Sequence, residues 1–199
     1  MARPLSTDKK TVVAAAMDLL AKNGLRGMSI RSVAGSLGLA PNAMYSYFAD
    51  REQLETAVAA EVAGRLHAVL LEACAEKTSE DSIRALAKAY LRFAKEQHLI
   101  YEALVVTRPA SGEDSISPEL LWLFFVEQVD RITGASKSQE AAVALWAFLH
   151  GIAALQSAEA FNEEKPMSSF EFGLSAWIEA TKVARHGDPA PKACLVQSP

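Results

Sequence analysis

Apolar residues recur three and four positions apart along most of the chain, which is the spacing of one face of an α-helix. The first such stripe stops at Asn23-Gly24, a pair typical of helix ends, and comprises Val12, Val13, Ala16, Leu19 and Leu20. No run alternates polar and apolar residues as a half-buried strand does, and no Asn-Gly or Asp-Gly pair joins two such runs. The pattern therefore predicts an all-α protein.

Capping residues and helix breakers set the expected helix boundaries. Ser29 is a good N-cap, and Asp50 is another, with Gln53 at the reciprocal capping-box position. Ser117-Pro118 pairs a cap with a proline that suits the first turn of a helix. The expected helices cover residues 6–22, 30–37, 41–47, 52–75, 80–96, 98–106, 118–131, 139–161 and 169–185.

Two of these helices are short and joined by a tight turn, which predicts a helix-turn-helix. Gly38 can adopt the left-handed conformation that the turn needs, and Pro41 fits the first turn of the second short helix. Met44 and Phe48 lie four apart and share a face, so we expect them to pack into the core of a small head at residues 1–51. A helical body at 52–186 and a disordered tail at 187–199 complete the expected organisation.

The charge of the chain is unevenly distributed. The formal net charge is −4, but residues 1–51 hold seven basic and three acidic side chains, a local charge of +4, and the remainder carries −8. A basic head on an acidic body suggests that the head meets an anion such as DNA. A surplus of this size also arises by chance, so charge alone does not decide the partner.

Two tyrosines close to the turn are candidate DNA contacts. Tyr45 and Tyr47 are expected on the exposed side of the second short helix, where each hydroxyl can donate to a phosphate oxygen. Pro41, Asn42 and Ala43 lead this helix and would enter the major groove. There Asn42 can pair with adenine, and Ala43 can touch a thymine methyl. The pattern alone is equally compatible with an ordinary helical corner that partly buries its tyrosines.

Residues 24–54, "GLRGMSIRSVAGSLGLAPNAMYSYFADREQL", resemble the DNA-binding segment of the TetR (tetracycline-repressor) family. The matching features are Gly24, Ser29, Val33-Ala34, Gly38, Met44-Tyr45, Tyr47-Phe48, Arg51 and Leu54. The departures are Ala40 in place of Ser or Thr, Asn42-Ala43 in place of Gly-Thr, and Arg51 in place of Lys. They leave the motif intact, but an operator sequence known for another member of the family does not carry over to this chain.

The resemblance implies a ligand-responsive transcriptional regulator that is a homodimer on a palindromic double-stranded operator, and it favours a repressor. The body at 52–186 would then bind an effector and dimerise. The implied DNA contacts are phosphate contacts by Tyr45, Tyr47 and Arg51, a phosphate site at Ser29, and base contacts by Ala40, Pro41, Asn42 and Ala43. Arg26 and Arg31 are further phosphate candidates or else solvated surface charges.

The family dimerises through its last two long helices, and the helices expected at 139–161 and 169–185 are similar in place and length. The first is apolar nearly all round, so it must be covered on more than one side. Gly151 in mid-helix suggests that another backbone comes close there. The expected four-helix dimer interface comprises Leu145, Leu149, Ile152, Gln156, Phe170, Leu174 and Trp177.

Trp146-x-x-x-His150-Gly151 resembles a signature in a subgroup of the family's ligand-binding bodies. His150 is therefore a candidate effector contact, and a histidine satisfied within the helix packing is the alternative. The other candidate pocket residues are aromatic side chains that could equally be plain core, namely Tyr90, Phe93, Tyr101, Trp122, Phe125 and Trp146.

The cysteines, the histidines and the longest apolar run argue against several other classes of function. Cys74 and Cys194 form no C-x-x-C pair and no two histidines lie at helical ligand spacing, so we expect no disulfide, metal or cofactor. The apolar run at 120–126 is too short to span a bilayer, and a cytoplasmic, non-enzymatic protein is expected. An all-helical carrier or enzyme for an apolar small molecule, with no DNA role, is the alternative.

Overall fold

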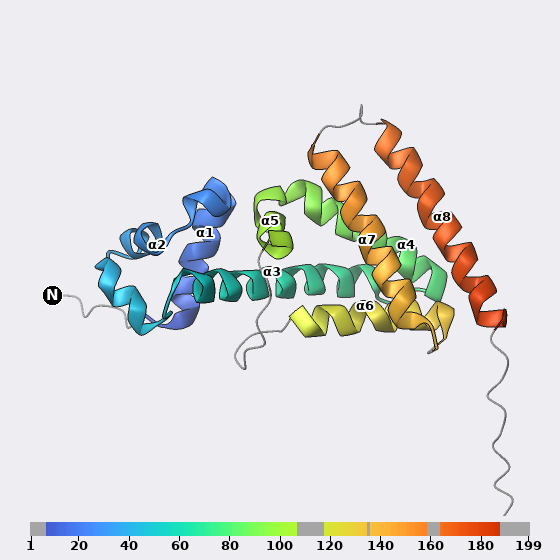
Figure 1. The fold of residues 1–199 in the computed structure, drawn as a ribbon, viewed down its shortest axis with the longest axis horizontal. Helices are drawn as coiled ribbons and strands as arrows, with labels where there is room; N and C mark the ends of the chain where they lie inside the picture. Colours follow the sequence, from blue (N-terminus) through green and yellow to red (C-terminus); the bar gives the residue numbers. More distant parts are fainter. Residues whose placement is uncertain (1–6, 107–117, 135, 159–163, 188–199) are drawn as a thin grey trace, which may run out of the picture. The chain divides into compact units, whose positions relative to one another are not determined.

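The computed structural model describes residues 7–106, 118–134, 136–158 and 164–187 (Figure 1). Every regular element in these ranges is helical, which confirms the all-α prediction. None of these helices is long and apolar enough to cross a membrane. The elements in order are α1 (Lys9–Gly27), α2 (Ile30–Ser36), the 3-10 helix η1 (Pro41–Ser46), α3 (Arg51–Cys74), α4 (Ser79–Glu96), α5 (His98–Val106), α6 (Pro118–Thr133), α7 (Ser138–Ser157) and α8 (Glu164–Gly187).

Local signals fixed several helix boundaries. The expected stop at Gly24 is present as a kink inside α1, where this residue has φ 65° and ψ −175°, a conformation that favours glycine. Asp50 caps α3, because its carboxylate accepts a hydrogen bond of 2.8 Å from the backbone N–H of Gln53. The Gln53 side chain accepts in turn from the backbone N–H of Ala49, at 3.0 Å. Apart from Gly187, the expected tail lies outside the described residues.

The chain forms two compact units, and α4 and α6 each contribute to both. The first unit comprises residues 1–76 and 85–124. Within it, α5 packs against both α1 and α3. A Cβ atom on Gly24 would lie 3.2 Å from the Leu99 side chain of α5. The absence of a side chain at the kink in α1 therefore lets Leu99 pack closely there. The expected head thus shares a unit with α3 and α5, and a domain boundary at residue 51 stays a prediction.

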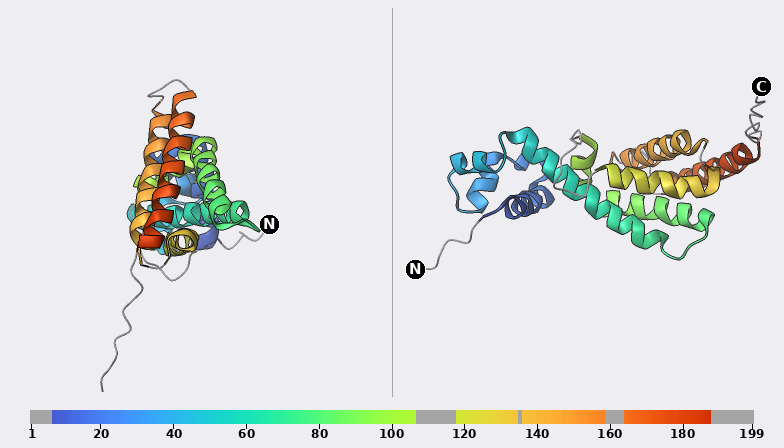
Figure 2. Two further views of the ribbon diagram at one scale, coloured as in Figure 1. Left: turned by 90° about the vertical axis from the view of Figure 1, so that its right-hand side faces the viewer. Right: turned by 90° about the horizontal axis from the view of Figure 1, so that it is seen from below.

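The second unit comprises residues 77–84 and 125–199, and in it α7 and α8 run side by side (Figures 1 and 2). The rings of Phe148 and Phe170 stack with their centroids 6.3 Å apart. Gly173 makes this possible, since a Cβ atom there would lie 2.5 Å from the Phe148 ring. The indole N–H of Trp177 donates to the carbonyl of Ala141 at 3.2 Å. These contacts hold α8 against α7 along much of their length.

Candidate nucleic-acid interface

The segment from α2 to η1 is the helix-turn-helix corner that the sequence predicted. Gly38 has φ 67°, the left-handed conformation that the turn needs, and a Cβ atom there would have open space around it. The backbone conformation, and not crowding, therefore favours glycine at this position. The N–H of Leu39 donates to the carbonyl of Ala34 at 2.9 Å and closes the turn.

The second helix of the corner is a 3-10 helix and not the α-helix expected at 41–47. Its hydrogen bonds join residues three apart: the N–H of Ala43 donates to Ala40, and that of Tyr47 donates to Met44, both at 2.9 Å. A six-residue element that begins with a proline is short enough for this tighter geometry. With three residues per turn, Asn42 and the residue three positions on, Tyr45, project from the same side.

Burial on the other side holds this 3-10 helix to the head. Met44 is fully buried and Phe48 nearly so, and both belong to the same core as Val33 and Ala34. By contrast 57% of the surface of Tyr45 is exposed. Among the residues that lead the element, Ala40, Pro41 and Asn42 are exposed and Ala43 is half-buried. The corner thus presents an accessible face, with Asn42 as its polar side chain, at the position that the sequence assigned to base contact.

Tyr47 is placed differently from Tyr45. It is half-buried, and its hydroxyl donates a hydrogen bond of 3.1 Å to the backbone carbonyl of Thr7. A phenol carries one O–H donor, so this hydroxyl cannot donate to a phosphate while it is bonded to Thr7. The expectation that both tyrosines project freely therefore holds for Tyr45 and is wrong for Tyr47.

Ser29 caps α2, as the sequence predicted, and its hydroxyl makes the capping hydrogen bond. It accepts from the backbone N–H of Ser32 at 3.1 Å and lies 3.0 Å from the hydroxyl of Ser32. The Ser32 hydroxyl accepts from the backbone N–H of Ser29 at 2.8 Å and lies 2.9 Å from the carbonyl of Gly27. Ser32 was not among the expected site residues, although a hydroxyl three positions after an N-cap is the signal of a reciprocal capping box.

Three arginines of this region keep their guanidinium groups accessible. Arg26 and Arg31 are exposed, and Arg51 is exposed while paired with Glu55. The Arg51–Glu55 pair spans 2.6 Å one turn apart on α3, and its arginine side chain retains 55% of its accessible surface. An exposed pair of this kind is weak, so Arg51 can exchange its carboxylate partner for a phosphate at little cost.

The aromatic residues expected in an effector pocket fall into two groups, one in each unit. In the first unit, Tyr90, Phe93 and Tyr101 are buried core residues. The hydroxyls of Tyr90 and Tyr101 lie 3.1 Å apart, and burial raises the pKa of both phenols, that of Tyr90 far above the usual value. Both rings therefore stay neutral. Trp122, at the start of α6, is half-buried.

The remaining pocket candidates form an aromatic row in the second unit. The rings of Phe125 and Trp146 lie 5.2 Å apart edge to face, and those of Trp146 and His150 lie 5.3 Å apart in the same manner. Phe125 is buried, whereas Trp146 and His150 are half-buried. Burial lowers the pKa of His150, so its imidazole is neutral at neutral pH and offers one donor and one acceptor.

The expected dimer interface needs a correction. Leu145, Leu149, Phe170 and Leu174 are fully buried within one chain, and Ile152 is nearly so, because these stripes face the core of their own protomer. Gln156 and Trp177 are half-buried. The side chains that α7 and α8 leave exposed are different ones, including Val143, Leu155, Phe172 and Val183. Gly151 is exposed, and a Cβ atom there would have open space around it.

A helix-turn-helix corner with an accessible second helix, in a basic N-terminal region of an all-α chain, defines a DNA-binding transcriptional regulator. Two family models agree with this class. The model for bacterial regulatory proteins of the tetR family matches residues 12–58, and the model for a tetracyclin repressor-like C-terminal domain matches residues 83–177. The two matches together span most of the chain, and the chain belongs to the TetR family. The alternative of a protein with no DNA role is set aside.

Individual relatives are distant but cover nearly the whole chain. An uncharacterized HTH-type transcriptional regulator of Bacillus subtilis, YobS, is 22% identical over 180 residues, which are 89% of this chain and 94% of that protein. A TetR variant of Acinetobacter baumannii in complex with minocycline is 21% identical, with a TM-score of 0.69 over 90% of this chain and 99% of that one. Apo ActR of Streptomyces coelicolor is 14% identical, with a TM-score of 0.73 over 94% and 99% of the two chains.

Proposed function

We propose that this protein is a cytoplasmic homodimeric repressor that a small-molecule effector releases from a palindromic operator. The observation that carries the proposal is the outward face of η1, where Asn42 and Tyr45 are exposed while Met44 and Phe48 are buried beneath them. Asn42 would read a base edge in the major groove. Tyr45 and Arg51 would hold the phosphates beside it, with Arg31 as a further basic contact.

The dimer would form through the exposed faces of α7 and α8. On α8, Phe172 is 80% exposed and Val183 is 72% exposed, and on α7 Val143 is 56% exposed. Such large apolar side chains in water favour a partner surface. Several exposed residues between them are small, which would let a partner helix come close: Ala147, Gly151 and Ala154 on α7, and Ala176 and Ala180 on α8. A two-fold pairing of these faces would present two identical recognition elements to a palindrome.

The effector would contact the row formed by Phe125, Trp146 and His150. Two of its three rings are half-buried, and the neutral imidazole of His150 could orient a polar group of an otherwise apolar ligand. The motif Trp146-x-x-x-His150-Gly151 supports placing the chain in the subgroup of the family that shares it. The TetR variant of A. baumannii in complex with minocycline is a relative of the same fold that holds a small molecule.

Release would follow a shift of α3 and α5. Because α5 packs on both α1 and α3, and Leu99 fills the space beside Gly24, a displacement of α5 would move α1 of the head. In the released state the two heads of the dimer would lie too far apart to bind the operator together. The effector can drive this change only to the extent that it binds the released state more tightly than the DNA-bound state.

Footprinting on DNA from the promoter of the protein's own gene tests the proposal. We expect one protected palindrome, with half-sites about one helical turn apart, in the absence of effector and at moderate salt. Addition of the ligand that co-purifies with the protein, identified by mass spectrometry, should remove the protection. Transcription in vitro from the same promoter should fall when the protein is added. Absence of any specific footprint would contradict the proposal, and a rise in transcription would contradict the repressor assignment.

A further inference from the structure

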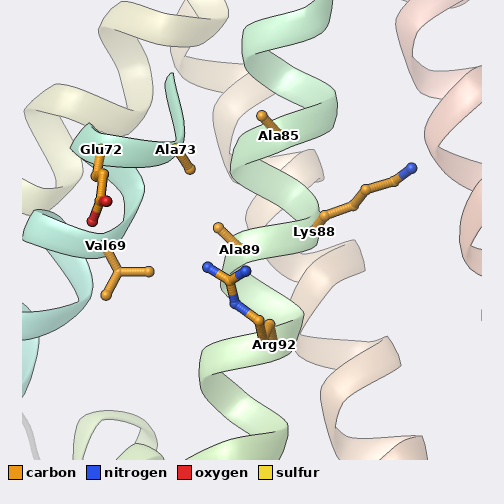
Figure 3. Close-up of a pocket in the computed structure, with 7 residues that line it drawn as sticks. All are labelled: Val69, Glu72, Ala73, Ala85, Lys88, Ala89 and Arg92. Atoms are coloured by element: carbon orange, nitrogen blue, oxygen red, sulfur yellow. The ribbon is translucent and has the colours of Figure 1, made fainter. Parts of the chain in front are cut away.

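A groove lies between α3 and α4 in the first unit (Figure 3). It has a volume of about 430 Å³, which is within the range of sites that bind small molecules. None of the residues that line it belongs to the effector row proposed above. The lining residues are Val69, Glu72, Ala73, Ala85, Lys88, Ala89 and Arg92.

Small side chains create the groove. Alanines from both helices line it, Ala73 on α3 and Ala85 and Ala89 on α4, and their short side chains leave the space between the helices unfilled. Val69 extends the apolar floor along α3.

Opposite charges stand on the two walls. Glu72 is exposed on α3 and Arg92 is exposed on α4, and neither forms an ion pair with any other residue that the structure describes. Figure 3 shows the Arg92 guanidinium turned from α4 toward α3, whereas the Lys88 ammonium points away from the groove. The groove therefore offers one anionic and one cationic group, separated by an apolar floor.

We propose that this groove binds a small zwitterion, an amino carboxylate whose two charged groups are joined by a short apolar chain. Its carboxylate would accept two parallel hydrogen bonds from the guanidinium fork of Arg92, and its ammonium would donate to the carboxylate of Glu72. The methylene groups would lie on Ala73 and Ala89. A simple anion would leave Glu72 facing a like charge, and a simple cation would do the same to Arg92, so the complementary ligand carries both charges.

A ligand that spans the groove would fix the spacing of α3 and α4. Helix α3 begins directly after the DNA-reading corner and belongs to the same unit, so such a ligand would act on the helix that supports the head. The binding site itself does not depend on the proposed repressor function, because its test requires no DNA.

Calorimetric titration of the full chain tests the ligand class. The probes are the linear ω-amino acids from aminobutanoate to aminooctanoate, with hexanoate and hexylamine as single-charge controls. We expect the best zwitterion to bind about tenfold more tightly than either control, since each control loses a charge-assisted hydrogen-bond partner. Equal affinity for zwitterion and controls, or no measurable binding of any ω-amino acid, overturns the proposal.

Substitutions of the charged lining residues, which are exposed, test the site with little effect on the fold. Arg92→Gln and Glu72→Gln should each weaken binding of the best zwitterion about tenfold. Lys95→Gln is the matched control on α4, because Lys95 is exposed and does not line the groove, and this variant should bind as the wild type does. Ala85→Leu should fill the half-buried floor and abolish binding. Circular dichroism checks that each variant is folded. Wild-type affinity in both charge variants, or an equal loss in Lys95→Gln, overturns the proposal.

Discussion

The hydroxyl of Tyr47 donates a hydrogen bond to the backbone carbonyl of Thr7, 3.1 Å away and forty positions earlier in the chain. This contact ties the segment that precedes α1 to Tyr47, the residue that directly follows η1. It gives Tyr47 a structural task, while its neighbour Tyr45 points into solvent with no such bond to another described residue. Two tyrosines that look alike in the sequence therefore differ in exposure and in hydrogen bonding.

Substitution of each tyrosine by phenylalanine should separate these roles. Tyr47→Phe should lower the free energy of unfolding by about 1 kcal/mol, the usual value of one hydrogen bond. Tyr45→Phe should leave unfolding unchanged and weaken binding to operator and unrelated DNA by a similar factor of about three to ten, because phosphate contacts carry no sequence information. Urea unfolding and fluorescence anisotropy at fixed salt measure the two effects. The opposite pattern, in which Tyr45→Phe is the destabilising change, would contradict the assignment.

Asn42 should behave as a reader of sequence. Asn42→Ala should remove discrimination worth about 1–3 kcal/mol at one base pair of each half-site and leave the other positions unchanged. Binding to a library of operator variants measures the preference at every position. Ser46→Ala is a suitable control, since the exposed Ser46 hydroxyl donates to the carbonyl of Ala43 within its own helix. An unchanged preference profile in Asn42→Ala would show that this side chain does not enter the groove.

The features that the sequence predicted correctly are local ones. Gly38, the cap at Asp50 and the break at Gly24 each depend on the backbone preferences of one or two residues. The reciprocal cap of Ser32 was missed although its signal, a hydroxyl three positions after Ser29, is equally local. The tie from Tyr47 to Thr7 could not have been foreseen, because it joins residues far apart in the chain.

The proposed dimer face on α7 shows what the periodicity of a sequence cannot predict. A helix such as α7 is apolar nearly all round, so its pattern does not tell which stripe faces its own core and which faces a partner. Leu145 and Leu149 are the larger side chains, and they are buried within one protomer, while Val143 and the small residues around Gly151 are exposed. Only the packing of α7 against its neighbours in the same chain decides between the two stripes.

The same substitution should have opposite effects at two glycines. Gly24→Ala places a Cβ atom on a backbone with φ 65° and 3.2 Å from Leu99, so it should destabilise the protein by about 1–2 kcal/mol. Gly35→Ala lies inside α2 with open space around it and should stabilise by about 0.5–1 kcal/mol. Urea unfolding measures both values. A stabilised Gly24→Ala variant would contradict the role given to the kink.

Phe172 should anchor the dimer. Phe172→Ser removes a ring that is 80% exposed in one chain, so it should leave the protomer folded and weaken dimerisation by about thirtyfold or more. Sedimentation at micromolar concentration measures the dimer, and anisotropy should show a matching loss of operator affinity. Leu71→Ser, at an exposed apolar position of α3, is the control and should remain as dimeric as the wild type. A dimeric Phe172→Ser variant would place the interface elsewhere.

His150 should make stability fall on mild acidification. Burial lowers its pKa in the folded protein below the ordinary value of 6.5, so the unfolded chain takes up the proton first as the pH falls. The folded state therefore loses stability as the pH drops through 6.5, until the pH reaches the lowered folded pKa and both states are protonated. His150→Gln removes this titration, and the difference between wild type and variant in the free energy of unfolding should change as the pH falls from about 7.5 through 6.5. Parallel pH profiles for the two proteins would show that the imidazole is not desolvated and would weaken its assignment as a neutral effector contact.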